Sequence, residues 1–167
     1  MKAAALTTIS GAIAASLCAT AQATPSDDAQ IRALESRFAA SFNAKDVNAI
    51  MKAYVPDNRL VVFDVVPPRQ YVGAEAYRKD WEGFLSGLKG PVKFDITDLY
   101  VFTDGPLGYS HSIQHVQGTD AKDQPIDLTV RVTDVYRKIK GDWLIVHEHV
   151  SVPVDLDTDK PDLLSKP

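Results

Sequence analysis

The chain contains 167 residues, of which 45% are hydrophobic, and its formal net charge at pH 7 is −4. This length suits one domain with a sizeable core, and the single cysteine excludes a framework of disulfides. A mildly acidic chain without a basic cluster also argues against nucleic acid and anionic membrane surfaces as partners.

The first 23 residues have the pattern of a cleavable signal peptide. Lys2 gives a positive start, residues 3–19 are uncharged and mostly small or apolar, and Ala21-Gln22-Ala23 fits a signal peptidase site. The apolar run is too short and too rich in Ala and Thr to be a stable membrane span. We therefore predict cleavage after Ala23 and a periplasmic or secreted protein. Because Cys18 leaves with the leader, the core alone must hold the mature protein together.

Three helices are predicted in the first half of the mature chain. The first begins near Ser26, which can cap its N-terminus, and its apolar residues recur at helical spacing: Ile31, Leu34, Phe38 and Phe42. Asp46 can cap a short second helix that ends before Pro56. Gly73 precedes the third helix, whose apolar side carries Tyr77, Trp81, Phe84, Leu85 and Leu88.

The other segments of the mature domain are predicted to be β-strands. A short β-branched run at 59–64 precedes the third helix, and four long runs follow it, separated by turn-type segments: 92–103, 107–118, 126–138 and 143–152. Helices first and an antiparallel meander afterwards predict an α+β domain, which we assign to residues 24–153, with the helices on one face of the sheet. Residues 154–167 alternate Asp, Lys and Pro and are predicted to form a loose polar tail.

Alternation along the strands assigns the side chains to two faces. One face is mostly apolar but is interrupted by polar residues; it carries Val116, Leu128, Val130, Val132, Tyr136, Leu144, Val146, Val150 and Val152 together with Ser110, Ser112, Gln114, Asp134 and Glu148. The other face carries Tyr109, His111, Ile113, His115, Arg131, Thr133, Trp143, Ile145, His147, His149 and Ser151. One face must cover the helices. The other is expected to meet a second copy of the chain, so we predict a homodimer.

Turn residues predict how the strands pair. A turn at Lys140-Gly141 pairs Lys138 with Asp142 and, further back, Thr133 with His147, Arg131 with His149, Asp134 with Val146 and Val132 with Glu148. The turn at 120–124 places Ser112 beside Val132 and His111 beside Thr133.

Several of these segments resemble a known superfamily. The strand that ends at Asp64, the stretch Val72-Gly73-Ala74-Glu75-Ala76, and the segments 131–138 and 141–151 resemble the nuclear transport factor 2-like superfamily, and within it the SnoaL-like, ketosteroid-isomerase-related group. Segment 141–151 is also similar to the association domain of calcium/calmodulin-dependent protein kinase II. The resemblance implies a cone-shaped, curved antiparallel sheet with the three helices of the N-terminal half packed on its concave face, a pocket at the wide end and frequent dimerisation.

The resemblance also implies roles for individual residues. Asp134 matches the protonated aspartate of the isomerase oxyanion hole, Asp64 matches the proton-shuttling base, and Trp81 falls at a pocket-lining position. The oxyanion tyrosine of the first helix corresponds to Phe38, and the loss of one such donor typically costs about 3 kcal/mol of transition-state stabilisation. Steroid isomerisation itself is therefore disfavoured.

The candidate carboxyl groups have two interpretations each. An apolar pocket raises the pKa of a carboxyl group, so that one acid can act as a base and another as a hydrogen-bonding acid near neutral pH. Alternatively, Asp64 caps the turn that follows it, and Asp134 pairs with Arg131 or Arg137. Glu148 lies between valines and needs a partner, which Ser112 or Gln114 could provide.

A second cluster consists of His111, His147, His149 and Arg131. In the predicted register His111 and His147 lie two strand spacings apart, about 9.6 Å, which is too far for one metal ion without both rings leaning inward. We therefore expect no metal, and no cofactor, since phosphate loops and dinucleotide fingerprints are absent from the sequence. The alternatives are an interface network and an anion site in which Arg131 and a histidine hold a ligand carboxylate.

These observations predict an exported single-domain protein that binds a small, largely apolar molecule or a carboxylate. The leading hypothesis is a cofactor-free isomerase or dehydratase that uses Asp64 as base and Asp134 as acid, with Trp81, Gln114 and Glu148 in the pocket. The alternative is a non-catalytic ligand-binding or oligomeric association module.

Overall fold

A computed structural model describes residues 25–164, and the predicted leader at 1–23 lies outside the described residues. The helical segments are α1 (Asp27–Asn43), α2 (Val47–Ile50), η1 (Met51–Ala53) and α3 (Ala74–Ser86), the last of which follows the first two strands. The strands are β1 (Val61–Phe63), β2 (Tyr71–Val72), β3 (Leu88–Asp104), β4 (Leu107–Asp120), β5 (Pro125–Ile139), β6 (Asp142–Ser151), β7 (Val154–Asp155) and β8 (Lys160–Pro161).

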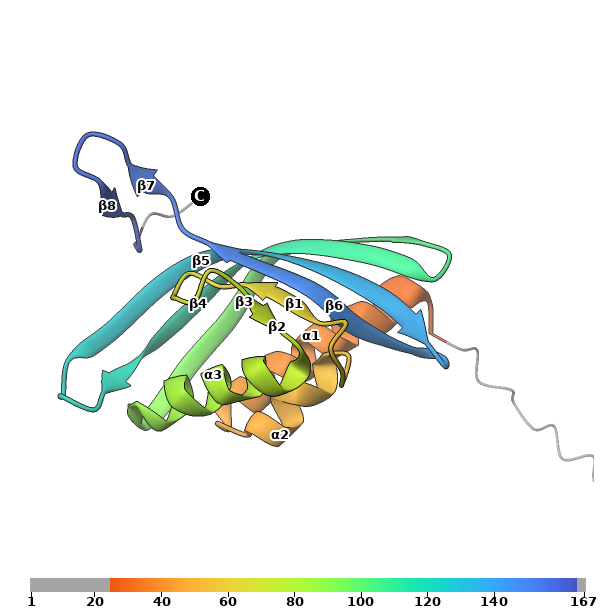
Figure 1. The fold of residues 1–167 in the computed structure, drawn as a ribbon, viewed down its shortest axis with the longest axis horizontal. Helices are drawn as coiled ribbons and strands as arrows, with labels where there is room; N and C mark the ends of the chain where they lie inside the picture. Colours follow the sequence, from red (N-terminus) through yellow and green to blue (C-terminus); the bar gives the residue numbers. More distant parts are fainter. Residues whose placement is uncertain (1–24, 165–167) are drawn as a thin grey trace, which may run out of the picture.

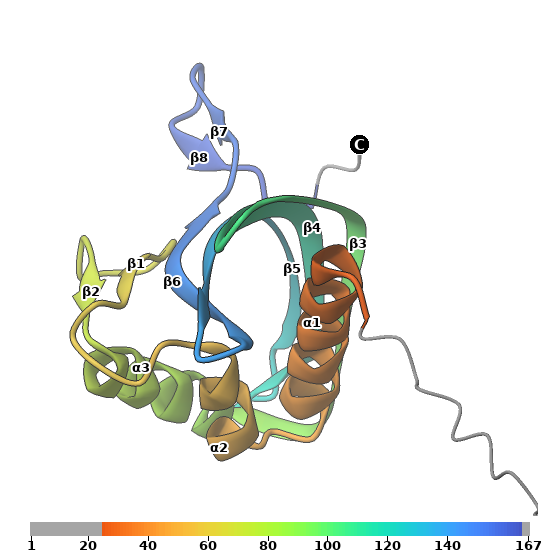
Figure 2. The same ribbon diagram turned by 90° about the vertical axis from the view of Figure 1, so that its right-hand side faces the viewer.

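The main sheet has the strand order β2-β1-β6-β5-β4-β3 (Figure 1). The four long strands form the predicted antiparallel meander, while β1 adds to β6 in parallel, so the sheet is mixed. Figure 2 shows β3 to β6 curving into an arch with the helices on its inner side. The predicted α+β class with a curved sheet around helices is therefore confirmed.

Local signals set the helix ends as the sequence predicts. The Ser26 side chain accepts a hydrogen bond from the Ala29 N–H at 3.2 Å at the start of α1, and Asp46 caps α2 through the Ala49 N–H at 3.0 Å. Gly73, at the start of α3, has φ +89°, and a Cβ there would lie 2.7 Å from Asn58 Oδ1. Glycine is therefore needed at this position for both its backbone angle and its size.

The predicted register of β4 with β5 is confirmed, but that of β5 with β6 is wrong. Ser112 pairs with Val132 and His111 with Thr133, whereas Thr133 pairs with His149 and Asp134 pairs with Glu148 rather than with Val146. Val132 pairs with Val150, Arg131 with Ser151 and Lys138 with Trp143. A bulge between Val135 and Tyr136 adds a residue on β6, so the register changes within the ladder.

Because of the bulge, four predicted face assignments on β6 are wrong. Upstream of it on β6, Trp143 and Ile145 are 4% and 1% exposed and belong to the core, although they were placed on the opposite face. The extra residue reverses the alternation along β6, so that Leu144 and Val146 lie outside the fully buried core instead. Downstream of the bulge the assigned faces are correct, and Asp134 and Glu148 both point to the buried side.

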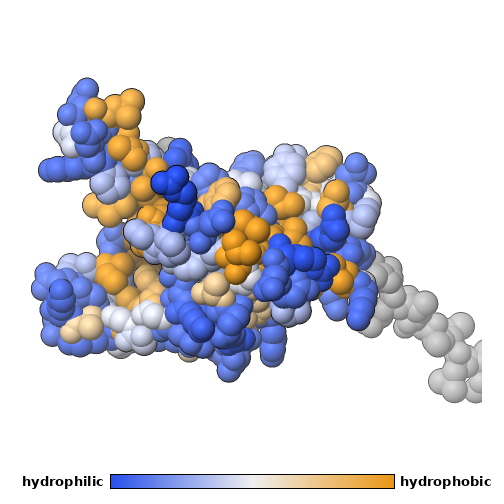
Figure 3. All heavy atoms as spheres, in the orientation of Figure 1, coloured by the Kyte–Doolittle hydropathy of each residue, from blue (hydrophilic) through white to orange (hydrophobic). Residues whose placement is uncertain are grey.

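The end of the described chain is not the loose tail that was predicted. Strands β7 and β8 form a two-stranded hairpin, and the Thr129 N–H of β5 donates to the Leu163 carbonyl at 2.8 Å. Figure 1 shows this hairpin projecting away from the main sheet, and Figure 3 shows hydrophobic side chains along it. Among the described residues, no helix is long and apolar enough to cross a membrane.

Candidate functional site

A cavity of about 380 Å³ lies between the inner face of the sheet and helices α1 and α3. Its walls are mostly apolar and aromatic: Phe38, Phe42, Trp81, Phe84, Phe94, Val116, Leu128, Val130 and Val150. The predicted residues Asp64, Trp81, Gln114 and Glu148 all line it, and Asp80 and Lys79 lie at the same cavity, so three carboxyl groups line it.

Two polar groups of the cavity walls, one side-chain amide and one indole N–H, have no hydrogen-bond partner among residues 25–164. Gln114 is 8% exposed, and its side-chain amide makes no hydrogen bond within this part of the chain. The buried Trp81 Nε1–H has no acceptor there either. Since buried polar groups are usually hydrogen-bonded, the Gln114 amide is available to recognise a ligand in the cavity.

Asp64 follows β1 and is half-buried at the cavity. Its Oδ1 accepts from the Val65 N–H at 2.6 Å, which is the turn-capping contact considered as an alternative, and its Oδ2 lies 3.3 Å from the Tyr77 hydroxyl oxygen. Burial is the main cause that raises the pKa of Asp64; the Val65 N–H opposes it, and the charge of Asp80 adds to it. A carboxylate with a raised pKa is a stronger base than an exposed one.

Glu148 is 5% exposed and accepts hydrogen bonds from two tyrosines. The Tyr77 hydroxyl lies 2.5 Å from Oε1 and the Tyr54 hydroxyl lies 2.8 Å from Oε2, so the expected partners Ser112 and Gln114 are wrong. Burial raises the pKa of Glu148, and the tyrosine hydrogen bonds partly offset this because they favour the ionised form. Tyr77 therefore joins Glu148 to Asp64 through one hydroxyl group.

Asp134 lies behind Glu148 and does not line the cavity. It is 1% exposed, its Oδ2 lies 3.5 Å from Ser110 Oγ, and it forms a side-chain hydrogen bond with Glu148. Arg131 and Arg137 are both exposed whereas Asp134 is buried, so the alternative in which Asp134 pairs with one of these arginines is wrong. Burial, followed by the charges of Glu148 and Glu35, raises the pKa of Asp134 well above its usual value.

The proton between Asp134 and Glu148 can be assigned from their other contacts. A hydrogen bond between two carboxyl groups needs one proton, and both oxygens of Glu148 already accept from tyrosines. Asp134 Oδ1 is buried and receives no donor from the described residues. Asp134 therefore carries the proton and donates it to ionised Glu148.

Glu35 and Tyr54 belong to this cluster but were not predicted as site residues. Glu35 is 3% exposed and accepts from the Tyr136 hydroxyl at 2.7 Å, and Tyr136 is in turn 2.8 Å from Ser110. Burial raises the pKa of Glu35 to about 7, although the Tyr136 hydrogen bond opposes this. The available signal was the position of Glu35 within the buried stripe of α1, between Leu34 and Phe38.

The four residues of the predicted second cluster lie on the opposite face of the sheet from the cavity. His111 and Arg131 line a separate hollow that also includes Asp98 and Thr133, and the His111 ring stacks on Tyr100 with centroids 5.1 Å apart. His147 Nδ1 lies 2.8 Å from the Val61 carbonyl oxygen, and the His149 ring contacts Phe63. Within residues 25–164, no three His, Cys, Asp or Glu side chains are grouped to hold a metal ion.

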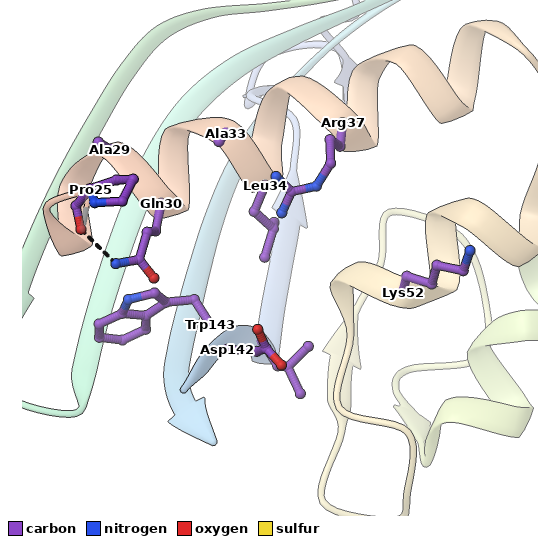
Figure 4. Close-up of a pocket in the computed structure, with 10 residues that line it drawn as sticks. Pro25, Ala29, Gln30, Ala33, Leu34, Arg37, Lys52, Asp142 and Trp143 are labelled. Carbon is purple, nitrogen blue, oxygen red and sulfur yellow. Dashed lines mark hydrogen bonds between the residues drawn. The ribbon is translucent and has the colours of Figure 1, made fainter. Parts of the chain in front are cut away.

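Another hollow, of about 500 Å³, lies between α1, η1 and the turn that joins β5 to β6. Figure 4 shows Leu34 of α1 on one side and Trp143 on the other, with Arg37 and Lys52 coming from separate helical segments. Its acidic member, Asp142, is exposed, and the buried carboxyl groups described above do not line it. The cavity with Asp64 and Glu148 is therefore the candidate site.

The comparisons with known proteins agree with this fold. The family model for the SnoaL-like domain matches residues 31–155. A nuclear transport factor 2-like protein of unknown function from Pseudomonas putida KT2440 is 31% identical, with a TM-score of 0.74 over 85% of this chain and 99% of that one.

Two further solved structures have related folds. A putative calcium/calmodulin dependent protein kinase II association domain from Xanthomonas campestris is 25% identical, with a TM-score of 0.64 over 82% of this chain and 91% of that one. A ketosteroid isomerase-like protein from Erwinia carotovora atroseptica is 19% identical, with a TM-score of 0.63 over 74% and 93% of the two chains. The search of curated proteins gave no match.

Proposed function

We propose that this chain, which belongs to the SnoaL-like domain family, is a cofactor-free enzyme of the isomerase or dehydratase type. Its substrate would be a small, largely apolar molecule with a carbonyl group. The observation that carries the proposal is that Asp64 and Glu148 line one apolar cavity and share the hydroxyl of Tyr77.

Asp64 is the base in this proposal. It takes a proton from the carbon next to the substrate carbonyl, and the electron pair moves onto the carbonyl oxygen. In an isomerisation Asp64 returns the proton to another carbon. In a dehydration the electron pair returns from the oxygen to form the new carbon–carbon double bond, and the β-hydroxyl takes the proton held by Asp64 as it leaves, so that water departs. Burial, which raises the pKa of Asp64, brings its basicity closer to that needed at neutral pH.

Gln114 and Glu148 support this step from the cavity wall. The amide of Gln114 has a free N–H that can donate to the carbonyl oxygen as negative charge develops there. Glu148 fixes the Tyr77 hydroxyl through their 2.5 Å hydrogen bond. Asp134, predicted as the acid that touches substrate, instead acts behind Glu148 because it does not line the cavity.

Proton exchange tests the role of Asp64 without knowledge of the natural substrate. The purified protein is incubated in D2O with a panel of cyclic enones and β-hydroxy ketones, and NMR follows deuterium entering next to the carbonyl. Wild type and the exposed-surface control Asp104→Asn should exchange at least one compound, and Asp64→Asn should lose this activity about 100-fold or more. Equal exchange by wild type and Asp64→Asn would refute the assignment.

We also propose that residues 1–23 direct export to the periplasm or the exterior and that the mature protein is a homodimer through the outer face of the sheet. Exposed aromatic residues on β3 and β4 support such an interface, namely Tyr100, Phe102 and Tyr109. N-terminal sequencing of the exported protein should begin at Thr24. Light scattering at micromolar concentration should give twice the monomer mass, and a monomer would contradict the dimer.

A non-catalytic ligand-binding module is the second candidate, and the absence of a hydroxyl on Phe38 favours it. Phe38 lines the cavity and packs edge-on against Trp81 with ring centroids 5.7 Å apart. A thermal-shift panel of carboxylates and sterols separates the two functions. Stabilisation by a compound that the protein does not turn over supports the binding module, because binding alone raises the apparent stability.

A further inference from the structure

Glu35 is a buried carboxyl group that the proposed reaction does not use. It lies on α1, is 3% exposed, and does not line the cavity with Asp64 and Glu148. A charged carboxyl group at such a position lowers the stability of the fold through desolvation, so the presence of Glu35 in the buried stripe of α1 suggests a functional role. Its contacts connect it to the site through β5 and β4.

A continuous series of polar contacts joins Glu35 to the cavity. The Tyr136 hydroxyl donates to Glu35 at 2.7 Å and lies 2.8 Å from Ser110 Oγ, which is 3.5 Å from Asp134 Oδ2. Asp134 is hydrogen-bonded to Glu148, which lines the cavity. Because Tyr136 gives its only proton to Glu35, its oxygen is left to accept from Ser110.

This orientation affects Asp134 directly. Ser110 has one hydroxyl hydrogen. Because it is donated over the shorter contact, 2.8 Å to Tyr136, it is not available over the 3.5 Å contact with Asp134 Oδ2, where it would stabilise a negative charge. The charge of Glu35 also opposes a second negative charge nearby, and it is among the causes that raise the pKa of Asp134. Both effects favour the protonated form of Asp134.

The titratable groups that interact with Glu35 come from every neighbouring element. They are Tyr136 and Asp134 on β5, Glu148 on β6 and Tyr54 after η1. None of them is a cation, so within the described residues this cluster has no positive charge that would compensate Glu35. Above its pKa of about 7, the Glu35 carboxylate therefore acts on Asp134 with little local neutralisation.

We propose that Glu35 is a positioning residue: acting through Tyr136 and Ser110, it keeps the proton on Asp134, so that Asp134 donates to Glu148 and Glu148 remains the fixed acceptor of the Tyr77 hydroxyl. The inference rests on the proposed function only in giving this arrangement a catalytic purpose. The arrangement itself is a property of the folded protein and can be measured without a substrate.

Carboxyl-carbon NMR titration tests the proposal directly. In Glu35→Gln the resonance of Asp134 should titrate about one pH unit or more below its wild-type position, because a neighbouring negative charge is removed. Tyr136→Phe, which keeps the ring but removes the connecting hydroxyl, should shift it in the same direction. The control Glu82→Gln removes an exposed carboxyl of α3 and should leave the Asp134 titration unchanged.

The results separate this inference from the proposed reaction. An Asp134 titration that is the same in wild type, Glu35→Gln and Tyr136→Phe overturns the positioning role. Should Glu35→Gln fail to fold, Tyr136→Phe alone decides the matter. The exchange assay with Asp64→Asn reports on the reaction independently. If the Asp134 titration shifts in Glu35→Gln but the wild-type protein has no exchange activity, the proposed enzymatic function is refuted while the positioning role of Glu35 is supported.

Discussion

Replacing Glu35 by glutamine should change how the stability of the protein depends on pH. The folded protein raises the pKa of Glu35 from 4.5 to about 7, mainly by burial. Between these two values the folded state holds a proton that the unfolded state releases, so rising pH destabilises the fold. The effect is absent below 4.5, develops between 4.5 and 7, and is complete above 7.

The size of the effect follows from the shift. Each pKa unit corresponds to about 1.4 kcal/mol, so the ionisation of Glu35 removes about 3 kcal/mol of unfolding free energy by pH 8. Glutamine has nearly the same shape and can still accept from the Tyr136 hydroxyl, but it carries no charge at any pH. The difference in stability between Glu35→Gln and wild type should therefore rise in favour of the variant by about 3 kcal/mol from pH 4 to pH 8.

Urea unfolding at half-unit steps from pH 4 to pH 8 measures this difference. Circular dichroism gives the unfolding free energy of wild type, Glu35→Gln and the surface control Glu82→Gln at each pH. The plot of unfolding free energy against pH for Glu82→Gln should run parallel to that of wild type, because Glu82 is exposed on α3. If the curve of Glu35→Gln also runs parallel to wild type, Glu35 is not a buried acid with a raised pKa, and the reasoning fails.

Further predictions concern hydrogen bonds and packing. Tyr77→Phe removes the hydroxyl that donates to Glu148 at 2.5 Å and lies 3.3 Å from Asp64, and it should lower the unfolding free energy by about 1–3 kcal/mol in urea unfolding; an unchanged unfolding free energy would contradict this role of the hydroxyl. Ser26→Ala removes the cap of α1 and should cost about 1 kcal/mol, seen as a lower Tm; an unchanged Tm would contradict it. Gly108→Ala places a Cβ 3.0 Å from the Phe102 carbonyl oxygen and 3.2 Å from Ile31 Cδ1, so it should destabilise the protein by about 1–3 kcal/mol in the same assay, and a neutral result would show that the strands can separate there.

The elements of the fold could be predicted because their signals are local. Ser26, Asp46 and Gly73 stand at the helix starts, and the apolar residues of α1 recur at helical spacing. Strand pairing between β5 and β6 depends on a bulge, which has no mark in the sequence near Val146. The turn at Lys140-Gly141 and the bulge each shift the register by one residue from the predicted pairing, so the total shift of two kept Asp134 and Glu148 on the correct face but gave them the wrong partners.

The sequence predicts which single residues line the candidate site, but it does not predict contacts between residues of distant segments. Asp64, Trp81, Gln114 and Glu148 could be placed from strand alternation and family resemblance, and all four line the cavity. The tyrosine partners of Glu148 could not, because Tyr54 follows η1 and Tyr77 belongs to α3, and only the folded chain brings them to β6.

Phe38 acquires a different meaning from these contacts. The missing hydroxyl at this position argues against a reaction that depends on a tyrosine of the first helix, and the hydroxyl groups of Tyr54 and Tyr77 are used as donors to Glu148. The polar group that α1 contributes is instead Glu35, one turn before Phe38, and it acts from behind the cavity through Tyr136. Chemistry in this cavity would therefore depend on how three buried carboxyl groups, Glu35, Asp134 and Glu148, share their protons rather than on a single donor on the first helix.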